Sequence, residues 1–159
     1  MSNGDEAILE VKGLKVGIED TPILKGIDLR IPKGEIHAIM GRNGSGKTTT
    51  ANVIMGHPAY DVEEGEILLD GENLQEMEPW ERSRKGVFLS FQYPQSIPGL
   101  QVGNFLRKSV SSVRGEEAAR GSDFREKLNQ AMEELDIPKS FLSRYCLLYT
   151  SDAADERLS

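Results

Sequence analysis

Residues 41–48, GRNGSGKT, constrain the fold of this chain more than any other stretch of its sequence. They follow a nearly continuous apolar run at residues 34–40, which predicts a strand covered on both faces. They lead into a short helix predicted over residues 47–55, which Gly56 and Pro58 would end. A strand, a glycine-rich turn and a helix in this order bring main-chain N–H groups and the positive end of a helix dipole to one point. The sequence therefore predicts a cradle for phosphate groups.

The residue types within this segment form a complete P-loop motif and suit the triphosphate of a nucleotide. Gly41, Gly44 and Gly46 would allow positive φ values and a close approach of the backbone to the phosphates. Lys47 would reach the β- and γ-phosphate oxygens, and the hydroxyl of Thr48 would coordinate Mg²⁺. The alternative, a glycine-rich turn with an incidental lysine, is disfavoured by the predicted strand before it and helix after it. The predicted nucleotide-binding residues are Gly41, Arg42, Asn43, Gly44, Ser45, Gly46, Lys47, Thr48 and Thr49.

Strands and turns are predicted on both sides of this motif. Residues 7–16 and 22–31 alternate apolar with polar side chains, which predicts two paired antiparallel strands. Residues 65–74 predict a strand that runs into a turn at Asp70 and Gly71, and Pro79 is the predicted first residue of a helix. Residues 86–91 predict another buried strand.

The last third of the chain is predicted to be helical. Phe124, Leu128, Ala131, Met132 and Leu135 would fall on one face of a helix. We interpret this stripe as packing within its own subdomain rather than as a partner-binding face.

Composition excludes several classes of protein. The length of 159 residues predicts one domain, and 38% hydrophobic with 28% charged residues is typical of a soluble globular protein. No apolar run approaches the roughly 20 residues that span a bilayer, and the first ten residues lack the pattern of a secretory signal. We therefore expect a cytoplasmic protein with no direct membrane insertion. The net charge of −7 disfavours nucleic acid as a main ligand.

His37 and His57 have no cysteine cluster near them and are interpreted as structural rather than as metal ligands.

A second motif separates this chain from other P-loop proteins. Gln92 follows the predicted strand at residues 86–91 directly, and residues 23–49 lead from an antiparallel hairpin into the P-loop. On these segments the chain resembles the ATP-binding cassette (ABC) ATPase family. The resemblance implies an α/β P-loop NTPase core with leading antiparallel strands and the start of a helical subdomain. It also implies ATP and Mg²⁺ as cofactors, ATP hydrolysis, and Gln92 as a catalytic residue near Mg²⁺ and the attacking water. Ile18 would offer the adenine an apolar contact.

Within that family the segments at residues 37–49, 56–74 and 86–100 resemble the SufC-type ATPases of the SUF iron–sulfur cluster assembly system. The resemblance runs from about Ile8 to Tyr145. It implies a second ATPase subunit, with two ATP·Mg²⁺ held between the two copies, and SufB- or SufD-like scaffold proteins as partners. Tyr93, Ile97 and Pro98, which follow Gln92, are candidates for contact with such a scaffold; a surface turn without a partner is the equal alternative.

Three other functions are considered. The nucleotide-binding subunit of an ABC membrane transporter would share the same motifs and differ in its partner. A P-loop kinase would transfer the γ-phosphate to a small acceptor, and Gln92 and the leading hairpin argue against it. A non-catalytic nucleotide-binding module is the third.

The sequence changes character after Tyr145. We expect residues 1–145 to be the N-terminal part of an ABC ATPase domain. Residues 146–156 resemble one reading frame of a transposase adapter used in sequencing libraries, so residues 146–159 are interpreted as a non-native tail. The only cysteine, Cys146, is therefore given no redox role. The family's signature motif, Walker B strand and switch histidine are not found in the sequence. The chain alone is therefore expected to be inactive, with residues 35–40 lacking their neighbouring strands.

Overall fold

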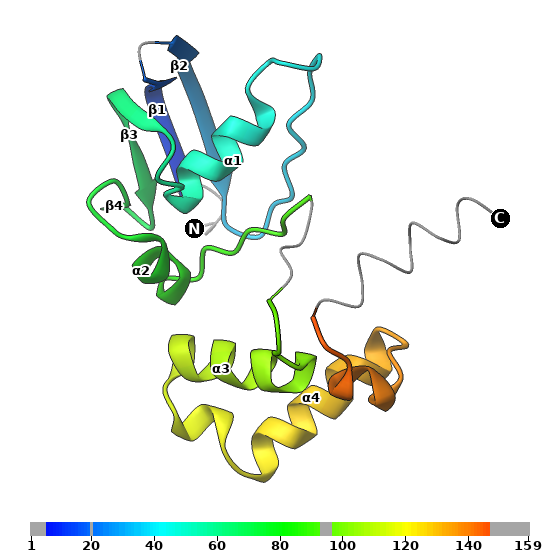
Figure 1. Cartoon of the computed structure of the whole chain (residues 1–159). Coiled ribbons are helices and arrows are strands. Elements are labelled where there is room, and N and C mark those ends of the chain that lie inside the picture. The colour runs from blue at the N-terminus through cyan, green and yellow to red at the C-terminus, as the bar shows by residue number, and fades with distance from the viewer. Residues whose placement is uncertain (1–5, 20, 93–96, 147–159) are drawn as a thin grey trace, which may run out of the picture. The chain divides into compact units, whose positions relative to one another are not determined.

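The computed structural model describes residues 6–19, 21–92 and 97–146 of the chain (Figure 1). These residues belong to two compact units, which divide between Ser90 and Phe91. The first unit contains the sheet and the P-loop, and the second contains helices.

The first unit is built on a four-stranded antiparallel sheet with the strand order β2-β1-β3-β4. Its strands are β1 (Ala7–Ile18), β2 (Thr21–Pro32), β3 (Asp61–Leu69) and β4 (Glu72–Asn73). The predicted antiparallel pairing of the first two strands is confirmed. The predicted turn is confirmed as well, because Asp70 and Gly71 join β3 to β4 with φ values of 47° and 80°.

A bulge in β1 brings two apolar residues to the same core. Val11 and Leu14 are three positions apart, so in a regular strand they would face opposite sides of the sheet. The register shifts between them, and Gly13 adopts a φ of 56° while its N–H donates a 2.8 Å hydrogen bond to the carboxylate of Asp28. Both side chains are therefore buried, at 1% and 0% exposure.

Helix α1 (Lys47–Met55) packs on this sheet, and the short helix α2 (Pro79–Arg84) follows β4 (Figure 1). Both helices begin at the predicted residues. The core joins the sheet to α1 and to the segment after β4; its buried members are Val11, Leu14, Val16, Leu24, Val53, Ile67 and Leu74. Val53 is the residue of α1 in this cluster, so one turn near the end of α1 is fixed by the sheet core.

Two predicted strands are wrong. Residues 35–42 and 87–91 form no strand, and several of their large apolar side chains are exposed: Ile36 fully, Phe88 at 87% and Met40 at 88%. A strand requires hydrogen-bonding neighbours, and the described residues supply none beside either segment.

The second unit consists of α3 (Val102–Arg114), a 3₁₀ turn η2 (Glu117–Ala119), α4 (Ser122–Glu134) and a second 3₁₀ turn η3 (Lys139–Ser143). Its two ends meet, because Gln101 and Tyr145 form an antiparallel bridge and the N–H of Cys146 donates to the carbonyl of Leu100 at 2.9 Å. The predicted boundary at residues 145–146 stays a prediction, since residues 147–159 lie outside the described residues.

Helix α4 confirms the predicted helix, and its apolar stripe is partly buried. Phe124 and Met132 are buried, at 9% and 5% exposure, and Leu128 is half-buried. Ala131 and Leu135 are exposed. No helix within residues 6–19, 21–92 and 97–146 is long and apolar enough to cross a membrane.

Candidate nucleotide-binding site

The P-loop connects the apolar segment before residue 41 to the first turn of α1. Gly44 and Gly46 have φ values of 81° and 89°, so the predicted positive φ is confirmed at both positions. The prediction is wrong for Gly41, whose φ is not positive. A Cβ on Gly41 would lie 2.7 Å from the hydroxyl oxygen of Ser45, an exposed side chain that can rotate away.

The side chain of Lys47 reaches back across the loop. Its ammonium group donates hydrogen bonds to the carbonyl oxygens of Gly41 at 2.8 Å and Arg42 at 2.9 Å. An ammonium group has three N–H donors, so one is left after these two bonds. The loop is thus closed around a positive charge that can still donate to a phosphate oxygen.

The N-terminus of α1 adds main-chain donors beside that charge. Thr50 donates its N–H to the carbonyl of Gly46 at 2.8 Å, and the N–H groups before it belong to the first turn, where a helix has no internal acceptors. No acidic residue occupies this turn. The positive end of the helix dipole therefore meets no competing carboxylate from its own first turn.

The remaining loop residues differ in exposure. Arg42, Asn43, Ser45 and Thr48 are exposed, so their side chains are open to a ligand, whereas Thr49 is buried at 9% exposure. The exposed Thr48 hydroxyl is an oxygen ligand of the type that Mg²⁺ takes. A positive loop, free first-turn N–H groups and a hydroxyl at the same helix end fit the phosphates and Mg²⁺ of a nucleotide.

Leu24 of β2 is a supporting residue that the sequence analysis missed. It is 3% exposed, and a Cβ on Gly46 would lie 2.4 Å from its Cδ2 atom. The start of α1 is therefore packed against the sheet, and any side chain at position 46 would have to displace Leu24 at that contact. The alternating pattern of β2 predicts that Leu24 is apolar and inward, but not that it contacts the P-loop.

Arg82 of α2 was also missed. It is 5% exposed and donates hydrogen bonds to carbonyl oxygens at the other end of α1. No local pattern in the sequence marks it, because its acceptors lie 28 and 29 residues earlier in the chain.

Other predicted site residues lie outside the loop. Ile18 ends β1 and is 37% exposed, so it has apolar surface to offer a base. Gln92 belongs to the second unit and is exposed, as are Ile97 and Pro98. Tyr93, the third candidate for partner contact, lies outside the described residues.

The two histidines have neighbours in the first unit. The Nε2 atom of His37 lies 2.9 Å from a carboxylate oxygen of Glu35, and the Nδ1 atom of His57 accepts a hydrogen bond from the N–H of Ala59. The ring of His57 also packs edge-on against Tyr60. The structural role of both residues stays a prediction.

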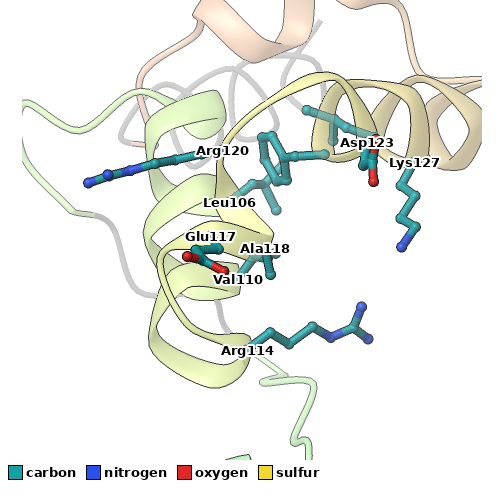
Figure 2. A pocket seen from close by; sticks show the side chains of 10 residues that line it. Leu106, Val110, Arg114, Glu117, Ala118, Arg120, Asp123 and Lys127 are labelled. Atoms are coloured by element: carbon teal, nitrogen blue, oxygen red, sulfur yellow. The ribbon is translucent and has the colours of Figure 1, made fainter.

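A cavity of about 340 Å³ lies in the second unit between α3 and α4 (Figure 2). Leu106, Val110, Phe124 and Leu128 provide its apolar lining. Charged side chains surround these residues: Arg114, Glu117, Arg120, Asp123 and Lys127. None of the predicted nucleotide-binding residues lines this cavity, so the P-loop remains the candidate site.

Solved structures with a similar fold include ATP-binding cassettes of ABC transporters. The ATP-binding subunit of an ABC transporter superposes with a TM-score of 0.72 at 25% identity, covering 87% of this chain and 54% of that one. An ATP-binding cassette solved in its ADP conformation gives a TM-score of 0.68 at 24% identity, covering 88% and 57%. The predicted α/β ABC ATPase fold is confirmed.

Curated relatives are more similar in sequence. A protein of Cyanophora paradoxa named probable ATP-dependent transporter ycf16 is 48% identical over 147 residues, covering 91% of this chain and 57% of the relative. A probable ABC transporter ATP-binding protein of Streptococcus pyogenes serotype M3 is 43% identical over 140 residues, covering 87% and 55%. This chain spans a little over half the length of these relatives.

The ABC transporter family matches residues 24–154, which include nine residues that the sequence analysis assigned to a separate tail. That match includes the P-loop and its helix and spans most of the chain, so the chain belongs to the ABC transporter family.

Proposed function

We propose that the protein binds ATP with Mg²⁺ at the P-loop and hydrolyses it. The observation that carries this proposal is the position of Lys47, whose ammonium group bonds Gly41 and Arg42 and keeps one N–H for a phosphate oxygen. A second ATPase subunit of the same kind is part of the proposal, because ABC ATPases hold two nucleotides between two copies.

Each residue has a distinct proposed task. Lys47 and the first-turn N–H groups of α1 hold the phosphates, and Thr48 supplies an oxygen ligand for the metal. Mg²⁺, when bound, neutralises the charge that develops on the phosphate oxygens. Gln92 orients the attacking water and serves as a further metal ligand, and Ile18 contacts the base. In this proposal, hydrolysis depends on the positioning of the attacking water and on stabilisation of the charge on the phosphate oxygens, rather than on a covalent intermediate.

We further propose that ATP hydrolysis drives iron–sulfur cluster assembly on SufB- or SufD-like scaffold proteins. The resemblance of residues 37–49, 56–74 and 86–100 to SufC-type ATPases supports this assignment. Ile97 and Pro98 are exposed and follow Gln92 closely, so they are available for a scaffold contact.

The second candidate is the nucleotide-binding subunit of an ABC membrane transporter. The names of the similar proteins from Cyanophora paradoxa and Streptococcus pyogenes favour it, since both contain the word transporter. The two candidates share the nucleotide chemistry and differ in the partner.

Nucleotide binding is tested first, by calorimetric titration of the protein expressed from its complete gene with ATP, ADP and AMP in the presence of Mg²⁺. ATP and ADP should bind at least tenfold more tightly than AMP, because the loop is placed to hold the phosphates beyond the first. Equal affinity for AMP and ATP would contradict the proposal.

The partner is tested by ATP turnover with each candidate added. A SufB–SufD-like complex should raise the rate several-fold, and an ABC permease in lipid nanodiscs should leave it unchanged. The reverse result would assign the protein to transport.

A further inference from the structure

Arg82 is a buried cation whose guanidinium group donates hydrogen bonds to main-chain carbonyl oxygens. Its Nη1 atom donates to the carbonyl oxygens of Val53 at 2.8 Å and Ile54 at 3.0 Å, and its Nε atom donates to that of Met77 at 2.9 Å. A longer contact of 3.5 Å joins Nη2 to the carbonyl of Gln75. Burial lowers the pKa of Arg82, and the charge of Glu78 opposes that effect. Burying a charge costs free energy, and hydrogen bonds to the charged group offset that cost. The carbonyl oxygens around Arg82 provide these hydrogen bonds.

The acceptors on α1 are in its last turn. Carbonyl oxygens in the last turn lack the N–H partners that the helix interior provides, and a positive charge there complements the negative end of the helix dipole. The Val53 carbonyl also accepts the N–H of the capping residue Gly56 at 3.0 Å, so Arg82 adds a second donor to it. Arg82 supplies both the donors and the charge. Gly56 ends the helix with a φ of 83°, and a Cβ there would lie 2.8 Å from the guanidinium carbon of Arg82. The end of α1 is therefore shaped to fit the guanidinium group.

The opposite end of the same helix carries the P-loop. Helix α1 has only nine residues, about 13 Å of rise, and a helix this short depends on tertiary contacts for its position. Three contacts place it: Leu24 against Gly46 at the start, Val53 in the core, and Arg82 at the end. A helix moves as a stiff body, so a displaced C-terminus also displaces Lys47 and Thr48.

We propose that Arg82 is a positioning residue of the nucleotide site, acting through α1 on the phosphate-binding loop at the other end of that helix. The inference rests on the proposed function for its effect on ATP, but its effect on the loop does not require nucleotide. If Arg82 had only a structural role, replacing it would lower the fraction of folded molecules. The folded molecules would still bind ATP with the wild-type affinity.

The test compares Arg82→Lys, which keeps the charge and loses the planar fork, with the control Arg125→Lys. Arg125 is an exposed arginine of α4 in the second unit, so the control makes the same chemical change away from the sheet and α1. Two quantities are measured on the protein expressed from its complete gene. One is the hydrogen-exchange rate of the Thr50 amide without nucleotide, and the other is the Kd and stoichiometry for ATP.

Arg82→Lys should speed exchange of the Thr50 amide at least tenfold and raise the Kd for ATP at least tenfold, with the stoichiometry unchanged. Arg125→Lys should change neither quantity by more than twofold. A lower stoichiometry with an unchanged Kd would overturn the inference, and so would unchanged exchange at Thr50. Faster exchange in a protein that binds no ATP even as wild type would support the positioning role and refute the proposed function instead.

A second measurement covers the case in which Arg82→Lys does not fold. In the wild type at low urea concentrations, the amide of Thr50 and that of Val87, which donates to the carbonyl of Arg82, should exchange through one common opening event. Separate opening events with different free energies would show that α1 is placed independently of Arg82, against the inference.

Discussion

The ammonium nitrogen of Lys47 lies 2.8 Å from the carbonyl oxygen of Gly41, so the side chain that begins α1 also fastens the far end of the loop before it. Lys47 is only half-buried, and its remaining N–H can turn to a ligand. The lysine therefore has two tasks, to shape the loop and to neutralise phosphate charge.

The first prediction concerns removal of this side chain. Lys47→Ala should weaken ATP binding by about tenfold or more, because it deletes a charge-assisted hydrogen bond and loosens the loop. The far-ultraviolet circular dichroism should not change, since the loop side chain supports no helix or strand of the core. Calorimetric titration and circular dichroism check the two parts.

Lys25→Ala is the matched control, because Lys25 is an exposed lysine of β2 whose loss also removes one positive charge. Its ATP affinity should equal that of the wild type. Equal affinity in Lys47→Ala would refute the role assigned to Lys47.

The second prediction separates metal binding from phosphate binding at Thr48. Thr48→Ala should weaken ATP binding about tenfold in the presence of Mg²⁺ and leave binding in EDTA unchanged, because only a metal ligand is lost. Thr48→Ser keeps the hydroxyl and should behave like the wild type. If both variants bind ATP more weakly than the wild type in EDTA, and by the same factor, Thr48 acts on the phosphates or on the fold rather than on the metal.

The third prediction concerns Gln92. Gln92→Ala should slow ATP hydrolysis by about tenfold or more and weaken ATP binding by a smaller factor, because the variant loses the group that orients water while Thr48 remains as a metal ligand. Steady-state turnover and binding titrations measure the two effects. Gln130→Ala on α4 is the control, where an exposed glutamine bonds Glu134 at 2.9 Å. A loss of affinity without a loss of turnover in Gln92→Ala would assign Gln92 to binding.

The parts of the fold that the sequence predicts depend on near neighbours. The alternation in residues 7–16 and 22–31, the Asp70–Gly71 turn and the Pro79 helix start are all set within a few residues, and all are present. The P-loop helix is predicted for the same reason, since its start and its stop are encoded by adjacent glycines.

The parts that the sequence does not predict depend on distant contacts. Residues 34–40 have the apolar composition of a covered strand, yet a strand forms only beside a partner that offers its hydrogen bonds. Arg82 looks like an ordinary charged residue of an exposed helix, and only the fold brings the carbonyls of Val53 and Ile54 to it. Motif and helix signals thus predict the chemistry of the site, but not the residues that support it.

The fourth prediction tests the contact between Gly46 and Leu24. Gly44 and Gly46 have similar φ values of 81° and 89°, so alanine at either position costs about 1–2 kcal/mol in backbone strain. A Cβ at Gly44 meets nothing within 4 Å, whereas one at Gly46 would lie 2.4 Å from Leu24 Cδ2. The two glycines therefore form a matched pair that differs in packing.

Gly46→Ala should lower the free energy of unfolding by at least about 1 kcal/mol more than Gly44→Ala, because the new methyl group must displace a buried leucine. Leu24→Ala removes the obstructing atom, so in that background the two alanine substitutions should cost the same. Urea unfolding of the protein expressed from its complete gene measures all the free energies. If Gly46→Ala remains the costlier change after Leu24 has been truncated, the start of α1 is held by something other than its packing on the sheet.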